Sequence, residues 1–235
     1  MVDEGTTDDT AEVARRYTDR VLSRPFRGFS DQRRWADEQA TSEWILSLDC
    51  DETIPAALAE EIQAELRSPR HAAYQVPHLD YMFGKWIRWG GQFPQYHIRL
   101  YRRDASRWTN LIHERIDLPE REVGRLAHPI LHYAHLRVTD WIGKMARYTT
   151  LDAERMAQAG ERAPWWRLLV EPPLYLGYKF VVQQGWRDGM HGLALAMLHA
   201  TYRFVRNVKL WDLQQSAARS PEPQEAPPDV KGQRR

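Results

Sequence analysis

Three carboxylates stand within four residues of one another directly after an apolar run, in the stretch WILSLDCDETIP of residues 44–55. They are Asp49, Asp51 and Glu52. If the apolar run is a strand, two aspartates separated by one residue at its end can direct oxygen ligands to one point above the sheet. Mg²⁺ and Mn²⁺ prefer such oxygens and are commonly completed by substrate phosphates. The spacing therefore predicts a metal-phosphate site. One alternative stays open, because carboxylates that precede a helix also stabilise its unpaired amide groups and its dipole.

A further carboxylate, Glu114, follows an apolar stretch in NLIHERI at residues 110–116. Burial raises the pKa of a carboxyl group toward the working pH, which suits it to take a proton from a hydroxyl group. We therefore predict that Glu114 is a general base. The alternative is an ion pair between Glu114 and a nearby arginine.

His132 lies in the apolar segment PILHYAHL of residues 129–136, where the pattern is typical of a helix. A histidine in such a segment is either a metal or phosphate ligand or a packed, hydrogen-bonded core residue. His128 and His135 are nearby competitors for the same role.

Three arginines in the stretch HIRLYRR could bind phosphate oxygens in a bidentate manner, namely Arg99, Arg102 and Arg103. In a strand, Arg102 and Arg103 face opposite sides of the sheet, so at most one of these two is expected at the site. We predict that it is Arg102.

The elements that must position these side chains alternate between helix and strand in the N-terminal part. Helices are predicted over residues 11–17, 29–40 and 53–68, and strands over 20–26 and 43–48. This order predicts a mainly parallel sheet with helices on its faces. From residue 72 to 116 short strand-like pieces indicate a mixed-sheet extension, and from about Pro129 the pattern is helical.

Composition limits the classes of function. Lysine and arginine nearly balance aspartate and glutamate, with a formal net charge of +1, so charge gives no reason to expect a nucleic-acid partner. The single cysteine, Cys50, excludes an intramolecular disulfide and a cysteine-based zinc site. The segment MVDEGTTDDT lacks the features of a signal peptide, and the apolar run at 192–205 is too short to span a bilayer. A cytoplasmic location is predicted.

Several segments occur in an order that resembles glycosyltransferase family 2, and more narrowly its bacterial lipopolysaccharide core β-1,4-glucosyltransferase group. That group has segments of the types VDSGSTDGT, LDADE, RLFRR and VHE. This chain has VDEGTTDDT, LDCDE, RLYRR and IHE in the same order. The resemblance continues through YMFGKWIRWGG, KMARYTTLDA and GWRDGMHG, and so covers roughly residues 2–213.

The resemblance implies an α/β fold of the nucleotide-diphospho-sugar transferase (GT-A-like) type, with a mixed sheet and a C-terminal helical appendage. We expect a catalytic domain at residues 1–127, a helical, membrane-interface region at 128–213 and a disordered tail at 214–235. The resemblance also assigns roles to individual residues. Nucleotide-sugar contacts are implied for Asp3, Asp49 and Arg102, Mg²⁺ or Mn²⁺ binding for Asp51 and His132, and general-base catalysis for Glu114.

The implied function is inverting transfer of a hexose, glucose from UDP-glucose, onto a lipopolysaccharide core or another lipid-linked saccharide. A lipid-linked acceptor would explain why Trp and Tyr are mixed with Arg and Lys at residues 163–189, a composition typical of a membrane interface. This predicts peripheral contact with the cytoplasmic face of the inner membrane. The alternative is ordinary core packing of these aromatic side chains. Two other functions stay open: a truncated, non-catalytic nucleotide-sugar-binding module, and a family 2 transferase with another donor or a protein acceptor.

Members of this group begin with about one more strand and helix, roughly 35–40 residues that carry an NE-type segment. We therefore expect a sheet that lacks its first strand, from a misassigned start or a fragment. A chain of these 235 residues should then express poorly or bind UDP-sugar weakly, whereas extending the reading frame upstream should restore both.

Overall fold

The computed structural model describes residues 2–3, 7–25, 28–105, 108–109, 115–116 and 118–219. The chain divides into two compact units. The first comprises residues 1–88 and 92–134, and the second comprises residues 89–91 and 135–235.

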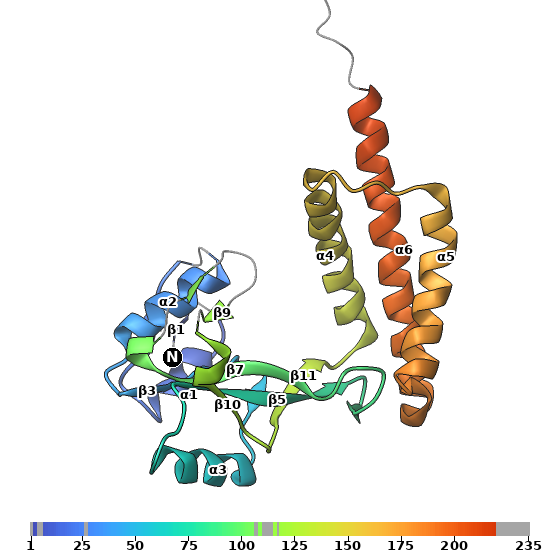
Figure 1. The fold of residues 1–235 in the computed structure, drawn as a ribbon. Helices are drawn as coiled ribbons and strands as arrows, with labels where there is room; N and C mark the ends of the chain where they lie inside the picture. Colours follow the sequence, from blue (N-terminus) through green and yellow to red (C-terminus); the bar gives the residue numbers. More distant parts are fainter. Residues whose placement is uncertain are drawn as a thin grey trace, which may run out of the picture. The chain divides into compact units, whose positions relative to one another are not determined.

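The first unit contains a seven-stranded sheet with helices on both of its faces. The strand order is β3-β7-β5-β11-β4, and β6 and β10 also pair with β5. Helix α2 (Phe29–Gln39) lies on one side of the sheet and α3 (Ala56–Leu66) on the other (Figure 1). The strands are β3 (Trp44–Leu46), β4 (Glu52–Thr53), β5 (Ala73–Met82), β6 (Lys85–Ile87), β7 (Gln95–Arg102), β10 (Val123–Arg125) and β11 (Ile130–His135).

Smaller elements accompany this sheet. Helix α1 (Thr10–Arg15) connects two short strands that pair in parallel, β1 (Val2–Asp3) and β2 (Leu22–Ser23). A second pair is antiparallel and consists of β8 (Trp108–Thr109) and β9 (Arg115–Ile116). Short 3₁₀ turns follow β7 at Arg103–Ala105 and precede β10 at Glu120–Glu122.

The expectation of a mainly parallel sheet is wrong. Strand β10 pairs with β5 in parallel, but β3–β7, β5–β7, β5–β6 and β4–β11 are antiparallel. The error comes from the strand-helix-strand order of β3, α3 and β5, which suggested that β3 and β5 are parallel neighbours in the sheet. Because β7 runs antiparallel to both β3 and β5, these two strands are parallel to each other, yet β7 lies between them.

Side-chain alternation along β7 supplies residues to two cores. Leu100 packs with Leu58 and Ile62 of α3, whereas the next residue, Tyr101, faces the other side of the sheet. There the Tyr101 hydroxyl donates to Oδ1 of Asp37 in α2, at 3.0 Å. Each fully buried large apolar side chain stabilises the unit by about 1.5–3 kcal/mol, so the sheet is held firmly between its helices.

The second unit is helical. It contains α4 (Val138–Gln158), α5 (Trp165–Gly177), a π-helical turn η3 (Tyr178–Val182), a 3₁₀ turn η4 (Gly185–Asp188) and α6 (Met190–Arg219). Helix α6 packs against both α4 and α5. Residues 89–91 belong to this unit because the Trp89 N–H donates to Oδ2 of Asp188 at 2.8 Å and Lys179 Nζ donates to the Gly90 carbonyl at 2.9 Å. No helix in the described part of the chain is long and apolar enough to cross a membrane.

Two boundaries of the predicted helical region are corrected. Residues 130–135 form strand β11 rather than a helix, because Ile130 is buried in the sheet core and His132 pairs with Glu52 of β4. At the other end, helix α6 continues to Arg219, so the expected disordered tail cannot begin at residue 214.

Candidate functional site

The three carboxylates lie on the turn between β3 and β4 and on β4 itself. Two hydrogen bonds join the ends of the turn: the Asp49 N–H donates to Oε2 of Glu52 at 2.9 Å, and the Glu52 N–H donates to the Asp49 carbonyl at 3.1 Å. Neighbouring strands hold it in place. The Ser47 N–H donates to the Arg99 carbonyl of β7, and the Tyr133 N–H of β11 donates to the Asp51 carbonyl, both at 2.8 Å.

The alternative role of these carboxylates, stabilisation of a helix N-terminus, is wrong. Helix α3 begins only at Ala56, and Pro55 stands at its N-cap without a side-chain cap. Glu52 instead lies in β4, opposite His132 of β11. The carboxylates therefore interact with charged and polar side chains of the sheet rather than with a helix dipole.

Arg99 is the central cation of the site. Its Nη2 lies 2.9 Å from Oδ2 of Asp49 and 2.5 Å from Oε1 of Glu52, and its Nε donates to Nε2 of His78 at 3.2 Å. Arg33 of α2 binds the other Asp49 oxygen, Oδ1, at 2.6 Å. The Arg99 and Glu52 side chains are almost fully buried, so this pairing compensates charges that solvent cannot reach.

His132 of β11 bridges two carboxylates. Its Nδ1 lies 2.8 Å from Oδ1 of Asp80 in β5, and its Nε2 lies 3.5 Å from Oδ2 of Asp51. The ring of His78 lies next to it, with centroids 5.9 Å apart. The expected helix is wrong, because His132 is on a strand, but the histidine is hydrogen-bonded to Asp80, as the alternative of a hydrogen-bonded residue expects.

The environment sets distinct charge states for these groups. Hydrogen bonds to Asp51 and Asp80 raise the pKa of His132 to about 10, so the imidazole is cationic at neutral pH without other ligands. Burial, reinforced by the charge of Arg99, lowers the pKa of His78 to about 3 and keeps it neutral.

The pKa values of the three carboxyl groups are also shifted in different directions. Burial raises the pKa of Glu52. Burial also acts to raise the pKa of Asp49, but Arg99 and Arg33 outweigh it and the net pKa is lowered. The pKa of Asp51 is lowered chiefly by its hydrogen bond with His132.

These side chains suit a divalent cation that is shared with a substrate. The described residues contain no group of three His, Cys, Asp or Glu side chains that could hold a metal unaided. Asp51 and His132 do form a pair, and Asp80 orients the imidazole through its other nitrogen, as carboxylates commonly do for metal-bound histidines. Two protein ligands are enough where waters and phosphate oxygens complete the octahedron of Mg²⁺.

The other predicted site residues have different outcomes. Arg102 is not brought to the carboxylates, because strand alternation turns it to the face opposite Arg99, where its Nη2 pairs with Oδ2 of Asp104 at 3.0 Å. Asp3 lies on β1, but its side chain is not among those that the structure describes. Glu114 lies outside the described residues, so its role as a base stays a prediction.

Four residues of the cluster were not predicted: Arg33, His78, Asp80 and Arg99. Arg99 was among the arginines considered, and the alternation of β7 places it on the same face as Tyr101. His78 and Asp80 are two residues apart in β5, the spacing that puts side chains on one face of a strand, and this signal could have indicated them. Nothing in the sequence pairs Arg33 with a residue that is 16 positions away.

Comparisons with known proteins show the family to which this chain belongs. The sequence model of glycosyl transferase family 2 matches residues 1–117. The chain is 30% identical over 220 residues to the lipopolysaccharide core biosynthesis glycosyltransferase LpsC of Rhizobium meliloti, an alignment that covers 90% of this chain and 81% of LpsC. It is 25% identical over 228 residues to an uncharacterized glycosyltransferase of Rickettsia typhi, covering 91% and 77% of the two chains.

Among solved structures, residues 1–349 of S. aureus TarS align with 92% of this chain and 81% of that one, at 13% identity and a TM-score of 0.37. That similarity is too low to support an inference about function. The predicted fold class, a GT-A-like mixed α/β sheet followed by helices, is confirmed by the family match and by the mixed sheet itself. The chain belongs to glycosyltransferase family 2.

Proposed function

We propose that the protein transfers a hexose from a nucleotide-diphospho-sugar, with inversion, onto a lipopolysaccharide core or another lipid-linked saccharide. The donor we propose is UDP-glucose. The main support is the 30% identity to LpsC of Rhizobium meliloti along most of both chains, together with the cluster of Asp49, Asp51 and His132 in the first unit.

The proposed roles follow from the charge state of each group. Asp49 is ionised and is fixed by two arginines, so it is a rigid hydrogen-bond acceptor for hydroxyl groups of the donor. Asp51 and His132 would hold Mg²⁺ or Mn²⁺, and Asp80 would keep the imidazole in position. When bound there, the cation neutralises the charge that develops on the departing nucleotide diphosphate.

An inverting transfer also needs a base near the acceptor hydroxyl. We propose Glu114 for this role, on the strength of the IHE segment at residues 112–114. A positioned base that takes a proton during attack typically contributes about 10²–10⁴-fold to the rate.

The test uses the purified protein with UDP-glucose, first without and then with Mn²⁺. Calorimetry should detect donor binding that depends on Mn²⁺. Release of UDP in the presence of a lipopolysaccharide-core acceptor should then follow. Binding without turnover on any acceptor would favour the alternative of a nucleotide-sugar-binding module, and turnover with another sugar nucleotide or a protein acceptor would favour a different family 2 activity. Absence of any binding would contradict the proposal.

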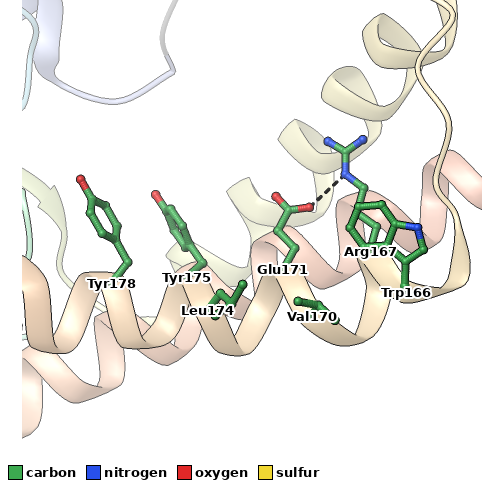
Figure 2. Close-up of a pocket in the computed structure, with 7 residues that line it drawn as sticks. All are labelled: Trp166, Arg167, Val170, Glu171, Leu174, Tyr175 and Tyr178. Carbon is green, nitrogen blue, oxygen red and sulfur yellow. Dashed lines mark hydrogen bonds and ion pairs between the residues drawn. The ribbon is translucent and has the colours of Figure 1, made fainter.

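The exposed face of α5 and η3 suggests where a protein that acts on a lipid-linked acceptor would contact a membrane. Apolar side chains recur at helical spacing and stay exposed: Trp165, Trp166, Leu169, Val170, Leu174, Tyr178, Val181 and Val182. Figure 2 shows a shallow hollow along α5, whose lining includes four of these exposed side chains, Trp166, Val170, Leu174 and Tyr178.

The charge of the same segment is complementary to anionic lipids. Two exposed basic residues stand near its ends, Arg162 and Arg187. Arg167 is paired with Glu161 and Glu171, and Lys179 is buried, so these two add little charge to the surface. Helices that lie on membrane surfaces combine exposed aromatic and aliphatic side chains with an excess of basic residues in this way. We propose that this face rests on the surface of an anionic bilayer.

A further inference from the structure

A second pocket, distinct from the carboxylate cluster, lies within the helical unit. It has a volume of about 330 Å³ and is lined by side chains of α4, α5 and α6. Four Trp and Tyr side chains line it: Trp141, Tyr148, Tyr175 and Tyr202. Its volume is at the lower end of the roughly 300–1,000 Å³ found for small-molecule sites, so it suits a ligand of about the size of one sugar residue.

The polar part of the wall is predominantly cationic. Lys144, Arg203 and Arg206 line the pocket together with one carboxylate, Asp152, whose Oδ2 accepts a hydrogen bond from Tyr202 at 2.6 Å. This excess of positive charge predicts an anionic ligand.

Glu171, next to the pocket, does not remove that excess. Nη1 of Arg203 lies 3.2 Å and Nη2 of Arg206 lies 2.8 Å from Oε1 of Glu171, and Arg167 Nε lies 3.1 Å from its other oxygen. Glu171 is thus shared by three guanidinium groups, and Arg167 also pairs with Glu161 at 3.2 Å. The arginines are held in fixed positions but are not neutralised in full.

Arg206 is a buried cation whose hydrogen-bond donors are only partly used. Its side chain is only 9% exposed, and its Nη2 is bonded to Glu171 and to Oδ1 of Asn207. Its Nε, in contrast, is buried and has no hydrogen-bond partner among the described residues. A buried N–H group without an acceptor costs free energy, so the hydrogen-bonding capacity of Arg206 is not used in full by its contacts within the protein.

The aromatic side chains define the rest of the ligand. The guanidinium of Arg203 stacks over the ring of Tyr175 at 4.4 Å, and the Trp141 ring meets His199 edge to face at 5.8 Å. Burial lowers the pKa of His199 to about 4, so this imidazole adds no charge at neutral pH. Aromatic faces next to hydroxyl, carboxylate and imidazole groups match a compact ligand that carries both apolar C–H surfaces and hydroxyl groups, such as a pyranose ring.

We propose that this pocket binds an anionic saccharide, with its phosphate or carboxylate group at Lys144, Arg203 and Arg206 and its ring against Tyr148 and Trp141. Binding of such a ligand does not depend on the catalytic role of the first unit. The identification of this saccharide as part of the acceptor does rest on the proposed function. A transferase that acts on a charged saccharide needs a site for the acceptor in addition to the donor site.

The test measures binding of glucose 6-phosphate by calorimetry in EDTA, with glucose and inorganic phosphate as separate probes. We expect glucose 6-phosphate to bind with a dissociation constant of roughly 1 mM or tighter, and each of the other two to bind at least about tenfold more weakly. Lys144→Met and Tyr148→Leu are suitable variants because both residues are exposed at the pocket. Each should weaken binding about tenfold, the loss expected for one charge-assisted or aromatic contact.

Arg162→Gln is the matched control, since it removes one positive charge from an exposed position that does not line the pocket. It should leave binding unchanged. Absence of glucose 6-phosphate binding, or binding that neither pocket variant weakens, would overturn the proposal. Equal binding of inorganic phosphate would overturn the saccharide part. Because EDTA removes divalent cations, these outcomes are separate from Mn²⁺-dependent binding of UDP-glucose, which tests the proposed function.

Discussion

The Nδ1 atom of His132 lies 2.8 Å from Oδ1 of Asp80, and this contact fixes the imidazole so that Nε2 faces Asp51. The two residues come from adjacent strands of the sheet, β11 and β5. Asp80 is half-buried, with a side chain that is 14% exposed, so the carboxylate is shielded and its position is well defined. This relationship gives Asp80 a role that can be separated from that of the direct ligands.

Asp80→Asn should weaken Mn²⁺-dependent binding of UDP-glucose by about 10–100-fold, because the imidazole loses the charged partner that orients it. Calorimetry in Mn²⁺ measures the effect. Asp104→Asn is the control, since Asp104 is an exposed carboxylate that pairs with Arg102 away from the cluster. An Asp80→Asn variant with unchanged affinity would show that the contact does not support the site.

Asp51→Asn and Asp49→Asn should each abolish metal-dependent binding, but they should differ in stability. Within the described residues the Asp51 side chain has one ion-pair partner, His132 at 3.5 Å, so its loss should leave thermal unfolding nearly unchanged. Asp49 pairs with Arg33 and Arg99, and its loss should lower the free energy of unfolding by about 1 kcal/mol, a small value because its side chain is 39% exposed. Normal Mn²⁺-dependent turnover in either variant would contradict the assignment.

Glu114→Gln should preserve donor binding but slow transfer by at least ~10²-fold, because the amide cannot accept the proton of the acceptor hydroxyl. The measurement is a comparison of UDP-glucose affinity with the rate of transfer at saturating donor. A variant with the wild-type rate, or an experimental structure that places Glu114 on the opposite face of the sheet from Asp51, would exclude the role.

Glu171→Gln should destabilise the helical unit, because three arginines lose their shared carboxylate. At pH 7 we expect a loss of about 1.5–3 kcal/mol, typical of hydrogen bonds to charged groups. Burial acts to raise the pKa of Glu171, but Asn207 and the arginines lower it below its usual value. The stabilisation is therefore full above the unfolded-state pKa of about 4.3 and is lost as the pH falls through the lower folded-state pKa.

Thermal unfolding at several pH values checks this prediction. The difference between wild type and Glu171→Gln should shrink as the solution is acidified. Glu154→Gln, at an exposed position of α4, is the matched control and should have little effect at any pH. A difference that is constant from neutral to acidic pH would mean that the ion pairs do not stabilise the unit.

Trp165→Ser combined with Leu174→Ser should reduce binding to vesicles that contain anionic lipid by at least about tenfold. Both substitutions remove an apolar side chain that would be buried at the boundary between the headgroups and the acyl chains. These residues are 74% and 67% exposed, so the unbound protein should unfold at a nearly unchanged temperature. Leu151→Ser, at a position of α4 that is 50% exposed, is the control. Co-sedimentation with vesicles measures the binding, and equal binding of the control and the double variant would contradict a specific membrane face.

The sequence predicted local elements better than it predicted their pairing. Helices α2 and α3 and strands β3, β5 and β7 lie where apolar periodicity and turn residues indicate. The insertion of β7 between β3 and β5 depends on contacts between distant residues, which periodicity does not encode. Strand β11 was mistaken for a helix because a short apolar run fits either period, and only its neighbours in the sheet decide between them.

The site was predictable to a similar extent. Asp49 and Asp51 are separated by one residue in the sequence, so their spacing alone indicates a shared position. Arg99 was not separated from Arg102 in advance, because the choice requires knowing which face of β7 meets the carboxylates. The partnership of His132 with Asp80 spans 52 positions and becomes visible only once β11 and β5 are neighbours.

Strand β5 has a consequence for how the first unit opens. It pairs with β6, β7, β10 and β11, so most strands of the sheet hydrogen-bond to it directly. Local opening at the edges leaves such a strand intact, and its amides should exchange with solvent deuterium only through unfolding of the whole sheet. His78 and Asp80 both lie on β5. Two polar groups of the site are therefore carried by the segment that should be the last to lose protection, and the arrangement of charges should survive fluctuations of the surrounding loops.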